Sequence, residues 1–391
     1  MGSKGRFGLI TAGGAGAVLI LTAACGVVGG SKTGGLAAGQ EGAVTITPVN
    51  GARSVRPDGP IQVRVGEGRL QDVTVQGQGV TVTGTMSADR KSWKSDRTLS
   101  PGTSYTVTVR ARHDGKTSTA TSTFSTLKPE RTLSIADVTP SVKGEKVGVG
   151  MPIIVRFDGP VADKAAVERA LTVTPEKPVP GAWRWIGSDQ VIYRTQTYWQ
   201  PHQTVRFTAR LAGVNAGQGV YGAKDVDQTI TIGARQITTG DIGEHHMTVT
   251  RDGRKLRTIP FSAGNGTTRE YTTTSGIHLL MGKENPVTME APGRKPGDPG
   301  YYKTVVNYGV RFSNSGEYTH SMPSTVSVQG SANVSHGCLN LSPSNAKWYF
   351  DIAQRGDVLK LTGSSRRLEW DNGWGFWQMP FDQWKQGSAL S

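Results

Sequence analysis

The sequence predicts a mainly β fold that is divided into several domains, and three observations lead to that fold class. The chain has 391 residues, which is longer than a single hydrophobic core usually serves and suggests about three domains. Short segments in which threonine and valine alternate with other residues recur along it, separated by glycine, proline and aspartate, as in strands joined by turns. Only residues 342–356 combine clear start and stop signals of a helix.

Residues 1–24 are expected to be an export signal. Lys4 and Arg6 give a short positive start, a largely apolar stretch follows, and small side chains precede Cys25. This order predicts a bacterial lipoprotein signal peptide with Cys25 as the site of lipid attachment. Thr22 stands where a large aliphatic residue is usual, so an uncleaved membrane anchor is the alternative. In either case we expect the rest of the chain at the outer face of the cell membrane, in the cell wall.

The charge of the exported part agrees with that location. The chain carries a formal net charge of +14, and removal of Lys4 and Arg6 with the signal leaves +12. Such a basic protein favours anionic surfaces. Because export separates it from nucleic acid, we expect anionic cell-wall polymers or lipid head groups as partners instead. Residues 25–42 are rich in glycine, alanine and serine and predict a flexible tether.

A repeated pattern indicates two similar domains after the tether. The segment 59–65, with the sequence GPIQVRV, returns at 151–157 as MPIIVRF, and a second pair of similar segments follows at an offset of about 100 residues. Units of this size built from short alternating strands are typical of β-sandwiches. We therefore predict two tandem Ig-like domains, at 43–130 and 131–234, without the cysteines that antibody domains use.

Tryptophans gather in two places. Trp183, Trp185 and Trp199 lie in the second Ig-like domain, where core packing is favoured over a sugar-binding surface. Residues 364–391 contain four of the nine tryptophans of the chain, which is unusual for a free tail. We expect this extension to pack back on the third domain, with a platform for wall glycans as the alternative. Its tryptophans are Trp370, Trp374, Trp377 and Trp384.

The third domain is predicted at 235–363 and is also rich in strands. Residues 247–254 have the pattern of a hairpin with an Asp-Gly turn. The main helix has Ser342 as its N-cap, proline at its first position and Gly356 as its terminator. This pattern places Cys338 on a turn just before a helix, where backbone N–H groups can converge on an oxyanion and lower the pKa of the thiol.

Cys338 is the strongest candidate for a reactive residue. The only other cysteine of the chain is Cys25, and a lipid there would leave Cys338 without a disulfide partner. An unpaired thiol in an exported protein is a liability unless its reactivity is used, and a glycine turn beside a histidine suggests a nucleophile. The sequence therefore predicts a cysteine acyltransferase.

A nucleophilic cysteine needs a base, and the chain has seven histidines. None follows Cys338, whereas papain-like enzymes place their histidine after the cysteine, so this order excludes them. His336 lies two residues from the thiol, where its backbone would line the turn. His320 lies 18 residues upstream, at the end of a strand-like segment, and can fold back onto Cys338. We expect His320 to be the general base.

His320, Ser321 and the segment 335–340, with the sequence SHGCLN, resemble the signature of L,D-transpeptidases with a YkuD-type catalytic domain. The order of lipoprotein signal, two Ig-like domains, catalytic domain and tryptophan-rich extension is similar to that of actinobacterial members. The resemblance implies a β-rich catalytic domain in which Cys338 is the nucleophile and His320 the base. It also implies that the backbone of Ser321 orients the imidazole.

The resemblance assigns further residues of the motif. It implies that the backbone N–H groups of His336, Gly337 and Cys338 form the oxyanion hole. Ser335 and Asn340, which flank the cysteine, are counted with the substrate-binding residues, and for Asn340 support of the turn and simple capping are alternatives.

A lid over the pocket is a further feature of the relatives. In these proteins a methionine and a tyrosine of the lid touch the donor peptide, which by position are Met289 and Tyr302. Tyr301 competes with Tyr302 for that role.

The implied reaction is acyl transfer between peptidoglycan stem peptides, without a cofactor or a metal. The thiolate attacks the carbonyl between residues three and four of a donor tetrapeptide, and His320 passes the thiol proton to the departing D-alanine. An amine of an acceptor stem then resolves the thioester and forms a 3→3 cross-link. Carbapenem β-lactams are implied as covalent inhibitors at Cys338. A non-catalytic wall-binding lipoprotein and a sortase-like cysteine transpeptidase are the alternatives.

The export signal leads to a first prediction. Cys25→Ser should release the protein from the membrane fraction or leave its signal unprocessed, because serine offers no thiol for lipid attachment. Cell fractionation and mass spectrometry of the intact N-terminus measure both outcomes. An uncut N-terminus in the wild-type protein as well, with the same membrane retention as in Cys25→Ser, would favour the uncleaved anchor.

Overall fold

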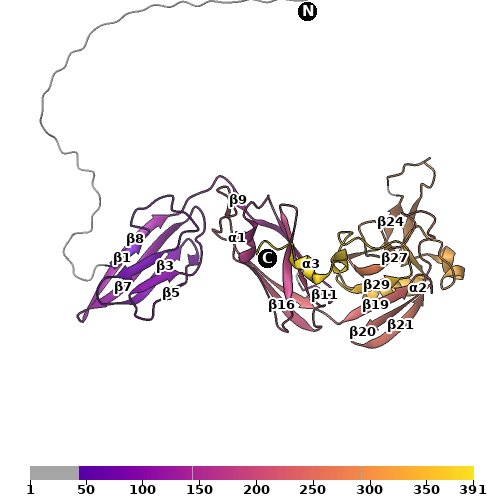
Figure 1. Ribbon diagram of the computed structural model, residues 1–391, viewed down its shortest axis with the longest axis horizontal. Coiled ribbons are helices and arrows are strands. Elements are labelled where there is room, and N and C mark those ends of the chain that lie inside the picture. Colours follow the sequence, from indigo (N-terminus) through magenta and orange to yellow (C-terminus); the bar gives the residue numbers. More distant parts are fainter. Residues whose placement is uncertain (1–43, 143, 292) are drawn as a thin grey trace, which may run out of the picture. The chain divides into compact units, whose positions relative to one another are not determined.

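The computed structural model describes residues 44–391 except 143 and 292, and these residues form mainly β-strands (Figure 1). Cys25, the predicted export signal and the predicted tether lie outside the described residues. Within the part of the chain that the structure describes, no helix is both long and apolar enough to cross a membrane.

Two four-stranded antiparallel sheets form the first domain. One has the strand order β1-β2-β6-β5 and the other β4-β3-β7-β8. Trp93, Tyr105 and Phe124 belong to its core. The strands are β1 (Val44–Thr47), β2 (Gln62–Val65), β3 (Arg69–Gly77), β4 (Val80–Thr81), β5 (Gly84–Met86), β6 (Ser92–Ser95), β7 (Ser104–His113) and β8 (Lys116–Ser125).

The second domain has two larger sheets, with the orders β10-β12-β15-β14 and β11-β18-β16-β13, and a small β17-β9 pair. A short helix, α1, lies between β12 and β13. The elements are β9 (Thr132–Leu133), β10 (Ile135–Thr139), β11 (Lys146–Val147), β12 (Ile153–Phe157), α1 (Lys164–Arg169), β13 (Leu171–Pro175), β14 (Gly181–Ile186), β15 (Gln190–Thr195), β16 (Gln203–Ala209), β17 (Tyr221–Gly222) and β18 (Val226–Ile232).

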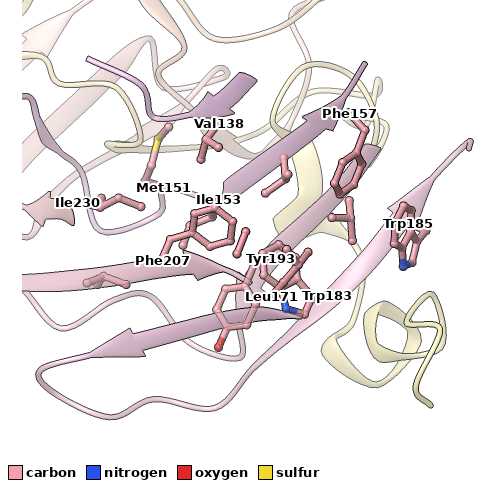
Figure 2. Close-up of a cluster of buried hydrophobic side chains, with 14 of the residues drawn as sticks. Val138, Met151, Ile153, Phe157, Leu171, Trp183, Trp185, Tyr193, Phe207 and Ile230 are labelled. Carbon is pink, nitrogen blue, oxygen red and sulfur yellow. The ribbon is translucent and has the colours of Figure 1, made fainter. Parts of the chain in front are cut away.

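The tryptophans of the second domain are core residues. Trp183, Trp185 and Trp199 are 7%, 9% and 2% exposed, and Figure 2 shows Trp183 and Trp185 among the other buried side chains. The indole of Trp185 stacks on Phe157, with 5.8 Å between the ring centroids. Core packing is therefore the role of these residues, because their burial leaves no ring face open to a sugar.

The third domain contains a five-stranded sheet of order β21-β20-β19-β29-β22, a four-stranded sheet of order β23-β26-β27-β28, and the β24-β25 hairpin. Its elements are β19 (Gln236–Asp241), β20 (His246–Arg251), β21 (Arg254–Pro260), β22 (Gly276–Leu279), β23 (Gly282–Glu284), β24 (Val287–Glu290), β25 (Lys303–Val306), β26 (Gly309–Arg311), β27 (Tyr318–Ser321), the 3-10 helix η1 (Pro323–Val328), β28 (Leu339–Leu341), α2 (Pro343–Ile352) and β29 (Val358–Thr362).

Two local predictions for the third domain are confirmed. Asp252 and Gly253 have φ values of 50° and 81° and join β20 to β21, as a tight hairpin turn requires. Helix α2 has Ser342 as its N-cap, and the Ser342 hydroxyl accepts from the N–H of Asn345 at 3.4 Å. Proline occupies the first turn, where a missing N–H costs little.

The end of α2 differs from the prediction. The helix stops at Ile352, four residues before Gly356, because Ala353 is extended and the N–H of Gln354 donates to the carboxylate of Asp357 at 2.9 Å. Gly356 has φ 83°, and a Cβ on it would lie 2.7 Å from the Cβ of Met151. Glycine is thus needed there because the second domain packs against it.

The C-terminal extension packs on two domains. It contains η2 (Gly375–Gln378) and α3 (Phe381–Lys385). The side chain of Gln378 donates to the Ile277 carbonyl of β22 at 3.0 Å, which agrees with the expected packing on the third domain. However, the Trp384 indole is fully buried and donates to the Ala182 carbonyl of β14 at 3.0 Å, so the second Ig-like domain is a further partner.

A buried arginine of the second domain anchors this extension. Arg194 is 3% exposed and donates to the carbonyls of Phe376 and Met379 at 3.0 and 3.1 Å. Its guanidinium also lies 4.9 and 5.0 Å from the ring centroids of Trp377 and Trp384. Burial lowers the pKa of Arg194 to about 10, which still leaves it charged at neutral pH. Carbonyl oxygens and aromatic faces thus replace water around a cation.

A stability prediction follows from this packing. Trp384→Ala should lower the free energy of unfolding by about 3–5 kcal/mol, because it leaves a cavity on β14 and a less shielded Arg194. Urea unfolding measures the change. Leu390→Ala is the control, since Leu390 lies in the same extension but is 48% exposed, and it should change the free energy by less than about 0.5 kcal/mol. Equal effects of the two substitutions would contradict the burial argument.

Candidate active site

The cysteine turn is stabilised by its own first residue. The Ser335 hydroxyl donates to the Cys338 carbonyl at 2.6 Å and accepts from the N–H of Gly337 at 3.1 Å. The N–H of Ser335 donates to the Ala263 carbonyl at 2.9 Å, which ties the turn to the neighbouring segment. Gly337 has φ 123°, a conformation that L side chains rarely adopt. The Ser335 hydroxyl is therefore committed to the turn itself, although the sequence placed it with the substrate-binding residues.

Three backbone N–H groups are expected to form the oxyanion hole, and two of them are available to bind an oxyanion. Among the described residues, the N–H groups of His336 and Cys338 have no protein acceptor, whereas the N–H of Gly337 is used by Ser335. Two N–H groups on one turn are sufficient to bind an oxyanion.

The thiol of Cys338 is held in its protonated form. Burial raises the pKa of Cys338 to about 12, although a hydrogen bond from the backbone of Tyr318 acts in the opposite direction. The sulfur lies 3.7 Å from the Gly316 carbonyl, to which its S–H donates. The sequence-based expectation of a lowered thiol pKa is therefore wrong, because burial outweighs the hydrogen bond from Tyr318 and the charge of Glu317 raises the pKa further.

Parallel pairing of β27 with β28 brings His320 next to the cysteine turn. In this register His320 is the partner of Asn340 and Thr319 is the partner of Leu339. Cys338 lies directly before β28, and its neighbour Leu339 is the partner of Thr319. The pairing therefore places the strand that carries His320 beside the cysteine turn.

The protonation state of His320 suits a base. The ring is 3% exposed, and burial lowers its pKa from the usual value, so the imidazole is neutral at neutral pH. Its Nδ1 lies 3.0 Å from the Ser321 carbonyl. A carbonyl only accepts, so Nδ1 carries the proton and Nε2 has the free lone pair. Ser321 thus contributes its main-chain carbonyl, as the resemblance implied.

Asn340 supports the site through its backbone. Its N–H donates to the Ser262 carbonyl at 2.8 Å, and its carbonyl accepts from the N–H of Ser262 at 3.1 Å. The side chain is buried, and its Oδ1 has no hydrogen-bond partner among the described residues. Among the described residues, the Asn340 side chain thus makes no hydrogen bond to the turn, which was one of the roles considered from the sequence.

The lid residues and the thiol belong to one apolar cluster. Met289, from β24, is 9% exposed, and Tyr302 and Cys338 pack against the same group of buried side chains. Tyr301 points elsewhere, since its hydroxyl donates to the exposed carboxylate of Glu290 at 2.9 Å. The structure therefore brings Met289 and Tyr302 to the thiol and leaves Tyr301 away from it.

The ring of His336 lies between two tyrosines. Its centroid is 4.6 Å from that of Tyr302 and 4.4 Å from that of Tyr271. The Tyr271 hydroxyl accepts from the guanidinium of Arg294, a residue of the lid loop, at 2.8 Å. Burial lowers the pKa of His336, and the charge of Arg294 lowers it further. The side chain of His336 thus connects the cysteine turn to the lid.

Sequence reasoning did not identify Tyr271 and Arg294 as part of the site. Tyr271 is distant in sequence from both the lid and the motif, and no spacing rule relates the three segments. The only signal for Arg294 was its position in the loop-like segment between Met289 and Tyr302.

Comparison with known proteins agrees with this geometry. Residues 235–361 match the family model of the L,D-transpeptidase catalytic domain, and residues 52–215 match that of a bacterial Ig domain. The chain is 35% identical to L,D-transpeptidase 2 of Mycobacterium tuberculosis strain CDC 1551 over 350 residues, which cover 88% of this chain and 85% of that protein. It is 36% identical to L,D-transpeptidase 5 of strain H37Rv, over 89% of this chain and 77% of that protein.

A solved structure supports the same assignment. An L,D-transpeptidase in complex with imipenem is 35% identical to this chain, with a TM-score of 0.51 over 59% of this chain and 99% of the other. The predicted fold class, Ig-like domains followed by a β-rich catalytic domain, is therefore confirmed. By its sequence and its fold, the chain belongs to the L,D-transpeptidase family.

Proposed function

We propose that this protein joins peptidoglycan stem peptides by 3→3 cross-links, with Cys338 as the nucleophile and His320 as the base. The proposal rests on the protonation states of His320 and Cys338. A neutral imidazole, oriented by the Ser321 carbonyl, lies on the strand that pairs with β28, and the protonated thiol directly precedes β28. Such a pair becomes nucleophilic only when the imidazole takes the thiol proton.

The first half-reaction forms a thioester. The sulfur attacks the carbonyl between residues three and four of a donor tetrapeptide, and Nε2 of His320 takes the thiol proton. The developing oxyanion lies against the N–H groups of His336 and Cys338. The tetrahedral intermediate then collapses with release of D-alanine, whose amine takes the proton from His320.

The second half-reaction transfers the acyl group to an amine. The side-chain amine of the diamino acid in an acceptor stem attacks the thioester, loses a proton to His320 and regenerates the thiol. Met289 and Tyr302 supply apolar cover over the sulfur, which limits access of water. Aminolysis then exceeds hydrolysis, and no metal or cofactor takes part in either step.

We further propose that the protein acts outside the cytoplasm, attached to the membrane through a lipid on Cys25. The net charge of +12 that remains after removal of Lys4 and Arg6 with the signal suits contact with anionic polymers of the wall. Carbapenems are proposed as covalent inhibitors, because the related structure noted above holds imipenem. The family assignment disfavours the sortase alternative, and the intact pair of Cys338 and His320 disfavours a non-catalytic wall-binding role.

The reaction itself is tested with purified disaccharide-tetrapeptide. The wild-type protein should form dimers whose mass corresponds to the loss of one D-alanine, and Cys338→Ala should form none, because the thioester cannot arise. Mass spectrometry of the muropeptides identifies the products, and circular dichroism checks that the variant is folded. Dimer formation by Cys338→Ala above a few percent of wild type would exclude Cys338 as the nucleophile.

The pH dependence of acylation tests the role of His320. With a thiol pKa near 12, attack by free thiolate would rise about tenfold for each unit of pH. If neutral His320 takes the proton, acylation by imipenem should instead stay level from about pH 7 to 9, because a base with a lowered pKa is already neutral there. His320→Ala should be slower by roughly 10²–10⁴-fold at pH 7 and should show the steep rise.

Stopped-flow absorbance of imipenem follows both profiles. A steep rise in the wild type, or a comparable loss in His336→Ala with none in His320→Ala, would reassign the base.

A further inference from the structure

A cluster of buried polar residues lies beneath the cysteine turn and has no role in the reaction proposed above. Its members, at most 3% exposed, come from the segment before β22, from β22 and from the segment between β26 and β27. Buried polar groups are costly unless they are paired, so a cluster of this kind needs an explanation. The members are Thr273, Thr274, His278, Ser313 and Glu317.

Glu317 is the centre of this cluster. One carboxyl oxygen accepts from the N–H of Thr274 at 2.7 Å, and the Thr274 hydroxyl lies 2.9 Å from both carboxyl oxygens. The Ser315 hydroxyl donates to the second oxygen at 3.1 Å. With its oxygens occupied in this way, the carboxyl group is a structural partner rather than a base for the thiol.

Two segments joined by Glu317 hold the cysteine turn. Gly316 precedes Glu317, and its carbonyl accepts from the thiol of Cys338. Thr273 precedes Thr274, and its hydroxyl donates to the Gly337 carbonyl at 2.7 Å. The hydrogen bonds between Glu317 and Thr274 therefore link the segment that holds the sulfur to the segment that holds the turn.

Glu317 is also near the turn. A Cβ added to Gly337 would lie 4.0 Å from Cγ of Glu317 and 3.3 Å from the Glu270 carbonyl oxygen, so both residues border the space beside Gly337.

His278 completes the cluster. Its Nε2 lies 2.8 Å from the Thr274 hydroxyl and its Nδ1 lies 3.3 Å from the Leu359 carbonyl. Since a hydroxyl has one proton, Thr274 donates either to Glu317 or to His278. Burial lowers the pKa of His278, so its ring enters the cluster as a neutral imidazole.

We propose that Glu317 is a positioning residue for Cys338, which links the Gly316 and Thr273 segments so that the thiol and the oxyanion-binding turn keep a fixed relative geometry. This inference rests on the proposed role of Cys338 as nucleophile. It does not make Glu317 a proton acceptor in the reaction.

Loss of this link should have two opposite effects on the sulfur. A carbonyl that accepts from S–H stabilises the protonated thiol, so a displaced Gly316 lets the thiol ionise more readily. At the same time the sulfur and the oxyanion donors are less well aligned, and misplacement of about 1 Å can slow an enzymatic step by about 100-fold. The titratable groups around the thiol that also enter its pH dependence are Glu317, His320, His336, Tyr302 and Tyr318.

The test measures two rates on the full chain. Alkylation of Cys338 by iodoacetamide at pH 8 is followed by mass spectrometry of the peptide that contains it, and acylation by imipenem is followed by absorbance. For Glu317→Ala we expect alkylation to be at least about threefold faster and acylation at least about tenfold slower than in the wild type. Glu317→Gln should stay within about threefold for acylation, because its amide can still accept from Thr274 N–H and donate to the Thr274 hydroxyl.

Two further variants keep the test independent of folding. Glu284→Gln makes the same change in an exposed carboxylate that accepts from the Tyr318 hydroxyl at 3.4 Å, and should leave both rates unchanged. Ser315→Ala removes one hydrogen bond to Glu317 from an exposed position, and should slow acylation by about threefold without lowering the melting temperature.

Several outcomes would overturn the proposal. Acylation of folded Glu317→Ala at the wild-type rate would do so, as would a parallel fall of both rates together with the melting temperature, which indicates general loosening. If Glu317→Ala does not fold, Ser315→Ala replaces it in the test. Acylation of Ser315→Ala by imipenem at the wild-type rate would then overturn the proposal. A wild-type protein that imipenem does not acylate would instead refute the proposed function, while the alkylation measurements would still report on the link.

Discussion

The parallel pairing of β27 with β28 is the constraint on which the site depends. It pairs His320 with Asn340, two residues after Cys338, and thereby brings the strand that carries His320 beside the cysteine turn. The backbone bonds between Asn340 and Ser262 hold the other edge of β28. A shift of this register by one residue would turn His320 to the opposite side, because side chains alternate along a strand. Sheet pairing therefore positions His320 and the strand that follows Cys338.

Burial then sets the chemistry of that pair. It raises the pKa of the Cys338 thiol and lowers the pKa of His320, so both groups are uncharged before substrate binds. A resting thiolate is open to oxidation, whereas a protonated thiol is a poor nucleophile. In the proposed mechanism, reactivity depends on proton transfer within an aligned pair. The hydrogen bonds of Ser335 and Thr273 hold the turn that carries Cys338.

The catalytic domain is also coupled to its neighbour in the chain. Leu279 and Val358, from the five-stranded sheet, belong to the hydrophobic core of the second Ig-like domain. The C-terminal extension covers Arg194 and buries Trp384 on β14. A protein cut at residue 235 would expose these apolar surfaces and a buried cation at once. The second Ig-like domain and the catalytic domain therefore share part of one hydrophobic core.

Local features of this protein are determined by its sequence alone. The Asp252-Gly253 turn and the Ser342 cap depend on neighbouring residues only, and the reactive pair was recognisable because Cys338 stands in a short, specific motif with His320 upstream. Contacts between distant segments carry no such signal. Tyr271 and Arg294 beside His336, Glu317 beneath Gly337, and the packing of Trp384 on β14 are each set by which surfaces meet in three dimensions. The raised pKa of the Cys338 thiol is another such property, because it follows from burial, which only the tertiary structure decides.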